Sequence, residues 1–388
     1  MMGKSQTDKT SFLVAHFKHT FFEKSDTFIY HYLTHMSRFI PICLSWRLDN
    51  IWQFPFPRCN MVDLKVPLSR IKKFLSAIFK RVLNRNYYFE RIIRERGVRL
   101  IHAHSGRDGL QVLHLKRKLG IPMVTSFYGA SLFRAALIDP ILKLLPKLFV
   151  GCEMFLVEGE FMKKRLLGLG CPLQKIEIQR IAIPVDTIPF KERRPKGSER
   201  VKLLFCGRFT EKNGLRVALE ALKKVREQNR DVSLCAVGDG ELKGDIQHYV
   251  DQNKMGEWVT MPGFLDYRDY LQRAAEADLF IHPALRATNG DGEGGGPIVI
   301  LEAQAMGLPV ISTYHADIPN MVVPDRSALL CAERDSEALA RNILFLLENQ
   351  HLWAQMGKTG RAFVEEFHDI KKEAKNLEEK YKVLIGKR

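Results

Sequence analysis

The sequence has no apolar run that could cross a bilayer. Its longest apolar zone, residues 137–157, is interrupted by Asp139, Lys143, Lys147 and Glu153 and by two prolines, whereas a spanning helix needs about 20 predominantly apolar residues. The first 20 residues also lack the apolar core of a secretory signal, because His and Lys interrupt the stretch SFLVAHFKHT. We therefore expect a cytoplasmic protein, and peripheral binding to the inner face of the plasma membrane stays open.

Cysteine is scattered, and repeats are absent. Seven cysteines occur without any Cys-x-x-Cys pair, which argues against a disulfide framework or a zinc site and for a reducing compartment. With only 27 Gly and 17 Pro and no period, the chain is neither collagen-like nor of low complexity. Since 46% of the 388 residues are hydrophobic, the chain is not disordered, and its length predicts about two or three domains.

Positive charge is in excess, and all of the excess lies in the first half. The formal net charge is +16, and residues 1–190 carry 30 Lys and Arg against 14 Asp and Glu. The segment 70–99 interleaves ten basic residues with aliphatic and aromatic ones, as one or two basic amphipathic helices would. Such helices dock on anionic lipid headgroups, so an anionic membrane surface is an expected partner; a solvated surface helix is the alternative. No RNA-binding or helix-turn-helix signature accompanies the charge, so we expect no nucleic acid as a partner.

Short apolar runs alternate with longer amphipathic stretches, which is the pattern of βαβ units in parallel sheets. The polar segment 191–200, KERRPKGSER, is the best candidate for a linker between two such series. The result would be two doubly wound α/β domains, with ligands beyond the carboxyl ends of the strands in a central cleft. The predicted strands are Arg99–Ala103, Met123–Phe127, Phe155–Val157, Lys202–Cys206, Ser233–Val237, Val259–Met261, Asp278–His282 and Pro309–Ser312, and the predicted helices are Leu110–Leu119, Asn213–Gln228, Leu242–Asn253, Tyr267–Ala277, Ile298–Met306, Ser336–Glu348 and Trp353–Glu366.

The glycine-rich stretch Asn289–Pro309 carries the most specific signal. Glycines 294, 295 and 296 let the backbone approach a ligand closely, and Pro297 fits the first turn of a helix. The amide groups at that helix N-terminus would attract an anion. Glu302 lies further along the helix, where its carboxylate could accept hydrogen bonds from a ribose diol. A glycine-rich loop before a core helix, with Glu302 solvated, is the alternative.

Two cations lie on another strand-to-helix loop, CGRFTEKNG at residues 206–214. Arg208 would fork two oxygens of a diphosphate, and Lys212 would add a point charge. The alternative for each is a solvated loop charge. The segments VGDGELKGDI at 237–246 and ADLFIHPA at 277–284 end at the same predicted edge.

Together, GRFTEKNG, VGDGEL, the glycine turn MPGFL, ADLFIHPA and GEGGGPIVILEAQAMGLPVIST resemble the nucleotide-sugar-binding half of retaining glycosyltransferases of the glycogen-synthase-like group, family 4. The resemblance covers residues 200–365 well, and VRLIHAH and IPMVTSFYGASLF match more weakly in the first half. It implies the GT-B fold, with two Rossmann-like domains. The expected boundaries are 1–195 for the acceptor-side domain, 196–366 for the nucleotide-sugar domain, and 367–388 for a helix that packs back on the first domain.

The resemblance also implies roles for individual residues. Arg208 and Lys212 would bind the donor diphosphate, and Glu302 would bind the ribose. Glu293 and Tyr128 would be the catalytic residues beside the transferred sugar, and Phe264 would lie near the base. The glycine loop and the helix start would complete the donor site, with neither a metal nor a cofactor, through Gly294, Gly295, Gly296, Pro297 and Ile298.

The chain departs from the family at three places. Eight residues separate Glu293 from Glu302, where the family usually has seven. Tyr128 stands where a histidine commonly precedes glycine; its hydroxyl could hydrogen bond to a sugar or a phosphate. The glycine loop near the N-terminus is replaced by HFKHTFFEKSDTFIYHYL, where Ser25, Asp26 and Thr27 are typical of a helix N-cap and resemble exopolysaccharide-type members.

His102 and His104 alternate at the end of a strand and so point the same way. No third ligand is near them in the sequence, so we predict no metal site there.

The sequence therefore predicts a retaining glycosyltransferase that moves a sugar from a nucleotide-diphosphate sugar to a saccharide or polyprenyl-linked acceptor, in cell-surface polysaccharide synthesis. A nucleotide-sugar epimerase or a hydrolase on the same fold is the alternative. A basic nucleic-acid-binding protein is a weaker one, because the glycine loop lies in the half without excess charge.

Overall fold

The structure is a computed structural model that describes residues 12–23, 25–57, 60–63, 87–129, 143–228 and 230–386. Most of the basic segment 70–99 lies outside these residues, so its predicted lipid-binding helices are described only from Tyr87 onward. No helix in the described part is long and apolar enough to cross a membrane.

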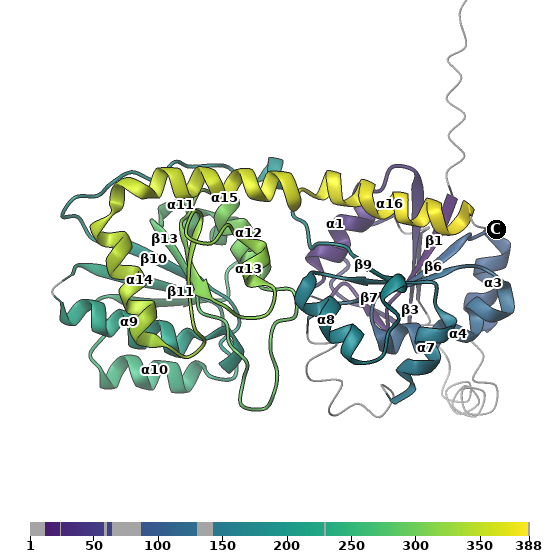
Figure 1. The fold of residues 1–388 in the computed structure, drawn as a ribbon, viewed down its shortest axis with the longest axis horizontal. Helices are drawn as coiled ribbons and strands as arrows, with labels where there is room; N and C mark the ends of the chain where they lie inside the picture. Colours follow the sequence, from purple (N-terminus) through teal and green to yellow (C-terminus); the bar gives the residue numbers. More distant parts are fainter. Residues whose placement is uncertain are drawn as a thin grey trace, which may run out of the picture.

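The first half of the chain forms a parallel sheet of seven strands in the order β5-β3-β1-β6-β7-β8-β9 (Figure 1). Strands β2 and β4 form a separate parallel pair. The strands are β1 (Phe12–Phe17), β2 (Thr20–Phe21), β3 (Phe39–Ser45), β4 (Arg47–Leu48), β5 (Met61–Asp63), β6 (Leu100–Ala103), β7 (Met123–Phe127), β8 (Met154–Val157) and β9 (Ile176–Ile178), and the helices are α1 (Thr27–His35), α3 (Tyr87–Glu95), α4 (Gly106–Leu119), α7 (Leu145–Gly151) and α8 (Glu160–Gly168).

The second half forms a parallel sheet of six strands in the order β12-β11-β10-β13-β14-β15. Both sheets are parallel throughout and are connected by helices, as doubly wound folds require. The strands are β10 (Val201–Cys206), β11 (Val232–Val237), β12 (Val259–Gly263), β13 (Leu279–His282), β14 (Val310–Thr313) and β15 (Ala328–Cys331), and the helices are α9 (Leu215–Glu227), α10 (Lys243–Gln252), α11 (Tyr267–Glu276), α12 (Ile298–Ala305), α13 (Ile318–Met321), α14 (Ser336–Glu348), α15 (Trp353–Phe367) and α16 (Ile370–Gly386).

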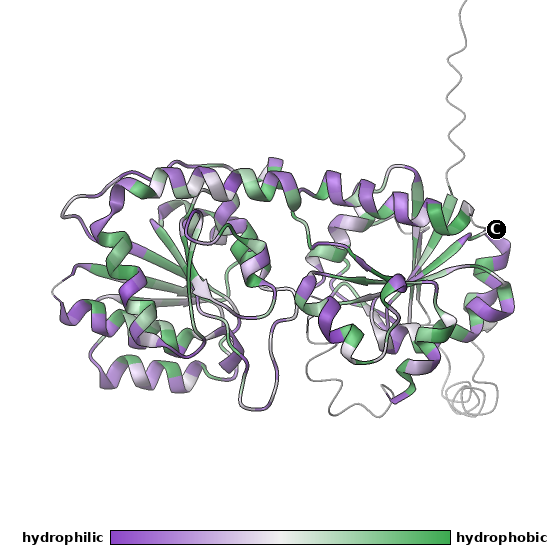
Figure 2. Ribbon diagram, viewed as in Figure 1, coloured by the Kyte–Doolittle hydropathy of each residue, from purple (hydrophilic) through white to green (hydrophobic). Residues whose placement is uncertain are grey.

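The hydropathy of the elements explains this layering. The strands of both sheets are mostly hydrophobic, whereas most helices are hydrophobic on one side and hydrophilic on the other (Figure 2). Strands covered on both faces must be apolar on both, and covering helices need only one apolar face. In α9, for example, Leu215, Leu219, Leu222 and Val225 are buried, while Arg216 is exposed.

Each predicted strand and helix is present, with ends that differ by a few residues. The prediction missed the strands β1, β2, β3, β4, β5, β9 and β15 and the helices α7, α8 and α13. In β3, Pro41 argues against a strand, because proline lacks the amide that a ladder needs; the structure accommodates Pro41 opposite Val14 of β1. In β1, the polar His16 interrupts the apolar run, yet it is 1% exposed.

The helices α15 and α16 run end to end along one side of the molecule and pass from the second half to the first (Figure 1). The buried face of α16 packs on the first sheet and on α1, through Ile370, Ala374, Leu377 and Tyr381. Glu378, 1% exposed, accepts hydrogen bonds from the Ser37 amide at 2.6 Å and the Arg38 amide at 2.7 Å. The C-terminal helix is therefore held to the first half by both apolar and charged contacts.

We expect Glu378→Ala to lower the free energy of unfolding by about 2–3 kcal/mol, because it removes a buried carboxylate that accepts from the amides of Ser37, Arg38 and Phe39. Glu379→Ala is the matched control: Glu379 pairs with Arg38 at the surface, and its side chain is 47% exposed. That change should cost no more than about 1 kcal/mol. Urea unfolding of both variants measures the difference, and equal losses would show that Glu378 does not anchor α16.

Candidate active site

A cleft of about 1510 Å³, a volume that includes open solvent, lies where the carboxyl ends of strands from both halves meet. The first half contributes the loop after β1, the start of α1 and the ends of β6, β7 and β8. The second half contributes the loop after β10, the end of β13 and the glycine loop. Among the residues that line the cleft are the predicted site residues Tyr128, Arg208, Lys212, Glu293, Gly295, Gly296, Pro297 and Ile298.

The glycine loop leads from Glu293 into α12. Gly296 has a φ of +123°, a conformation that residues with a Cβ rarely adopt. Pro297 was predicted in the first helical turn, and this is wrong by one position. It is the N-cap residue, with an extended backbone, and α12 begins at Ile298. Ile298 and Val299, the first residues of the helix, line the cleft, and their binding of an anion stays a prediction.

Lys212 lies in the 3-10 turn Glu211–Asn213 between β10 and α9. Its side chain is only 5% exposed, and its ammonium group lies 2.8 Å from Glu293 and 3.8 Å from Asp291. A buried charge needs a partner, and here Glu293 supplies it. Arg208, on the same loop, is exposed and lines the cleft. A dianionic ligand would therefore meet one exposed cation and one that is already paired.

The backbone of Glu293 is hydrogen bonded to His315, a residue that the sequence analysis did not identify. The Glu293 amide donates to His315 Nε2 at 3.1 Å, and His315 Nδ1 lies 2.7 Å from Glu333. Because Nε2 accepts, the ring proton of a neutral His315 is on Nδ1, where Glu333 binds it. The two hydrogen bonds, from Glu293 to His315 and from His315 to Glu333, fix the start of the glycine loop.

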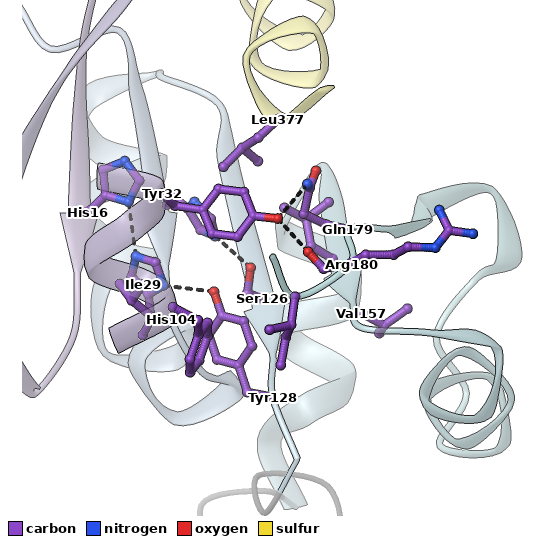
Figure 3. Close-up of a pocket in the computed structure, with 14 residues that line it drawn as sticks. His16, Ile29, Tyr32, His104, Ser126, Tyr128, Val157, Gln179, Arg180 and Leu377 are labelled. Atoms are coloured by element: carbon purple, nitrogen blue, oxygen red, sulfur yellow. Dashed lines mark hydrogen bonds between the residues drawn. The ribbon is translucent and has the colours of Figure 1, made fainter. Parts of the chain in front are cut away.

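Tyr128 follows β7, and its hydroxyl lies 3.0 Å from His104 Nδ1. His104 Nε2 lies 3.0 Å from His16 Nδ1, so a chain of hydrogen bonds leads from the cleft into the first sheet (Figure 3). Burial lowers the pKa of His16 and of His104 well below the usual value, and the neighbouring imidazoles lower it further. Both rings are therefore neutral, and each carries a single proton to share.

The sequence did not find a third histidine near His102 and His104, but the fold supplies one. His16 comes from β1, and nitrogen atoms of all three rings lie within 4.8 Å of one another. His102 uses both of its nitrogens, toward Tyr381 and toward Ser126 at 2.7 Å. A metal would have to break these bonds, so the arrangement fits a hydrogen-bonded core better than a ligand set. That no metal binds stays a prediction.

The N-cap prediction holds for position but not for side-chain chemistry. Asp26 is the N-cap residue of α1, but its side chain makes no cap hydrogen bond. Instead it accepts from the Glu23 amide and from Lys18, each at 3.0 Å. Lys18, Ser25, Asp26 and Thr27 line the cleft on the side of the first half.

Glu302 lies in α12 and is not among the residues that line the cleft as described. The Tyr267 hydroxyl donates to its carboxylate, and burial raises the pKa of Glu302 to about 7. Phe264, in the loop after β12, is 65% exposed. These two residues lie outside the described cleft, and their predicted contacts with ribose and base stay predictions.

Two further carboxylates were missed, Glu158 and Asp317. Glu158 follows β8 and lines the cleft, where its carboxylate accepts from the Gly129 amide at 3.1 Å. Asp317, from the second half, accepts from the Phe161 amide of α8 at 2.9 Å. The signal for Glu158 was its place directly after an apolar strand, at the same edge as Tyr128.

Comparison with solved structures defines the class of fold. A glycosyltransferase from Rickettsia africae superposes with a TM-score of 0.76 over 97% of this chain and 99% of its own, at 16% identity. HepE of Anabaena, solved in complex with UDP-glucose, superposes with a TM-score of 0.75 over 96% and 99%, at 12% identity. The predicted α/β fold, GT-B with two Rossmann-like sheets, is thereby confirmed.

Comparison of sequences gives the family. The profile of the glycosyl transferases group 1 matches residues 186–363, and that of glycosyltransferase family 4 matches residues 56–186. WcaL of Escherichia coli K12, a glycosyltransferase assigned to colanic acid biosynthesis, is 31% identical over 282 residues, which are 71% of this chain and 68% of WcaL. AmsK of Erwinia amylovora, an amylovoran biosynthesis glycosyltransferase, is 31% identical over 65% of this chain, and the match spans 61% of its own length. The chain belongs to the group 1 glycosyltransferases.

We expect the buried histidines to make stability depend on pH. Burial lowers the pKa of His16, so the unfolded chain binds a proton near pH 6.5 that the folded chain refuses. Stability is therefore present above pH 6.5 and falls as the pH falls, by up to about 1.4 kcal/mol per pH unit for each such histidine. His16→Gln should flatten this slope by about that amount between pH 6 and 5. Urea unfolding at several pH values measures both slopes, and parallel slopes would contradict the prediction.

Proposed function

We propose that this protein is a retaining glycosyltransferase that moves a sugar from a nucleotide-diphosphate sugar to a saccharide or polyprenyl-linked acceptor in cell-surface polysaccharide synthesis. The observation that carries the proposal is the cleft, where Arg208, Lys212 and the start of α12 face Tyr128 from the other half. The names of AmsK and WcaL, which refer to two exopolysaccharides, support the pathway class.

The cations and the helix start would act on the leaving diphosphate. Lys212 and Arg208 would bind its oxygens, and the first amides of α12 would add hydrogen bonds without reorganisation. As the diphosphate takes over Lys212, Glu293 loses its partner at 2.8 Å and becomes available to the hydroxyl groups of the sugar. This exchange would couple donor binding to the preparation of Glu293.

The transfer itself would need no covalent intermediate. The bond between the sugar C1 and the phosphate oxygen breaks while the acceptor hydroxyl forms a new bond on the same face. Because the new bond forms on the face that the phosphate leaves, the configuration at C1 is retained. The proton of the acceptor hydroxyl passes to the departing phosphate oxygen, which balances the charge. Tyr128 would hydrogen bond to the sugar or the phosphate, and contact between the two halves would exclude water.

The donor's nucleoside would lie toward α12 and the loop after β12. Glu302 would accept from the ribose hydroxyls in place of Tyr267, and Phe264 would contact the base. The acceptor would approach from the first half, whose excess of positive charge suits a substrate carried on an anionic membrane.

Arg208→Ala and Lys212→Ala should each weaken donor binding by at least about tenfold, since charge-assisted hydrogen bonds contribute about 1.5–3 kcal/mol. Lys243→Ala is the control, because Lys243 pairs with Asp239 on an exposed surface and does not line the cleft. Calorimetry with a panel of UDP-, GDP- and ADP-sugars identifies the donor and measures the loss. Unchanged affinity in both variants, with a donor that binds the wild type, would remove these residues from the site.

The same assay with and without acceptor separates the reaction classes. A transferase releases nucleotide quickly only when an acceptor saccharide is present. An epimerase or a hydrolase turns the donor over without one.

Donor affinity should also depend on Glu302 and on pH. Burial raises the pKa of Glu302 to about 7, so the charged form that accepts two ribose hydroxyls is lost as the pH falls below 7. We expect the dissociation constant to rise by up to about tenfold per pH unit below 7. Glu302→Gln should bind more weakly at pH 8, by about 1.5–3 kcal/mol, and should be independent of pH. A wild-type affinity that is constant from pH 8 to 6 would exclude this role.

A further inference from the structure

Glu158 joins the two halves of the molecule at the wall of the cleft. It follows β8 in the first half and is 8% exposed. Its carboxylate accepts from the Gly129 amide of its own half at 3.1 Å, and the same side chain lies directly against Gly295 of the glycine loop in the other half. One side chain therefore holds the loop that carries Tyr128 and the loop that carries Glu293.

The glycine loop fits around this side chain. A Cβ added to Gly295 would lie 2.3 Å from Glu158 Oε2 and 2.8 Å from Glu158 Cβ. Both distances are shorter than van der Waals contact allows. At the preceding position, a Cβ on Gly294 would lie 2.4 Å from the Cα of Gly129. The loop is thus shaped against the first half as well as toward a ligand.

A second carboxylate bridges the halves in the opposite direction. Helix α8 begins after Gly159, which has no side chain to cap it. Asp317 of the second half supplies the cap, because its Oδ1 accepts from the Phe161 amide at 2.9 Å. A Cβ on Gly159 would lie 2.4 Å from the Cγ of Asp317. Glu158 and Asp317 therefore each pack against the backbone of the other half, at neighbouring positions of the interface.

The protonation state of Glu158 is compatible with its place close to two other carboxylates. Burial, together with the nearby carboxylates Glu293 and Asp317, raises the pKa of Glu158 to about 8, against the opposing effect of the Gly129 amide. Arg180 lines the pocket on the far side of Glu158 together with Glu160, Asp317 and His368. Glu158 is therefore mostly protonated at neutral pH, and it adds little repulsion to Glu293.

We propose that Glu158 is a positioning residue that seats the glycine loop across the interface, and that Gly295 is its required counterpart. The inference rests on the proposed function for its effect on transfer, since the seated loop places Glu293 and the start of α12 against the donor. The contact itself exists whether or not the donor is a nucleotide sugar.

The test is a cycle of variants at the two positions. Gly295→Ala should lower kcat/KM at least tenfold, because its methyl group meets Glu158. Glu158→Gly removes every atom that this methyl group would meet in that side chain. In the Glu158→Gly background, the same Gly295→Ala change should therefore cost less than twofold. An equal cost in both backgrounds would overturn the proposal.

Two controls make the cycle specific. Gly294→Ala meets the backbone of Gly129 rather than Glu158, so Glu158→Gly should not reduce its cost. Glu160→Ala changes an exposed carboxylate next to Glu158 and should leave activity unchanged. Glu158→Gln keeps both the size of the side chain and an oxygen acceptor, and should therefore retain most of the activity.

A readout without any reaction separates this proposal from the proposed function. Amide hydrogen exchange in peptides that cover residues 290–297 should rise at least tenfold in Glu158→Gly and stay unchanged in Glu160→Ala. If exchange responds in this way while no nucleotide sugar is turned over, the contact holds and the donor assignment fails. If exchange does not respond, the contact does not seat the loop, whatever the enzyme transfers.

Discussion

The close approach of the glycine loop to the first half is the contact on which the candidate site depends. Gly294 lies so near Gly129 that no side chain fits between their backbones. Such an approach brings Glu293, Lys212 and the start of α12 to the same place as Tyr128. Each sheet alone would form only half of the cleft. The close packing of the Gly129 and Gly294 backbones therefore brings the polar side chains of both halves to one place.

The charges of the cleft are arranged so that a ligand changes their pairing. Lys212 is buried and is neutralised by Glu293, at a distance of 2.8 Å, while Arg208 is exposed on the same loop. Burying a lysine without a partner costs several kcal/mol, so Glu293 stabilises the buried Lys212. In the proposed reaction, a diphosphate would offer Lys212 a stronger partner and would release Glu293 beside the sugar. Donor binding and the preparation of Glu293 would then be a single electrostatic change.

The sequence predicted the second half better than the first. In β10 to β13, mostly apolar runs end at or just before a glycine or a proline, and the motifs that follow identify Arg208, Lys212 and the glycine loop. The first half lacks such punctuation: His16 breaks the run of β1, and Pro41 breaks that of β3. Contacts between distant segments were also out of reach. His16 and His104 are 88 residues apart, and nothing local indicates that Glu158 meets Gly295 of the other half.

The C-terminal helix α16 is connected to the candidate site by hydrogen bonds as well as by apolar packing. Tyr381 of α16 is hydrogen bonded to His102, whose other nitrogen lies 2.7 Å from Ser126. Ser126 and Tyr128 belong to the same strand end, and the hydroxyl of Tyr128 also lies 3.0 Å from His104. Because these buried rings and hydroxyls share few protons, the direction of each hydrogen bond constrains the next. The helix that crosses from the second half thus sets the polar core behind Tyr128, while Glu158 sets the loop in front of it.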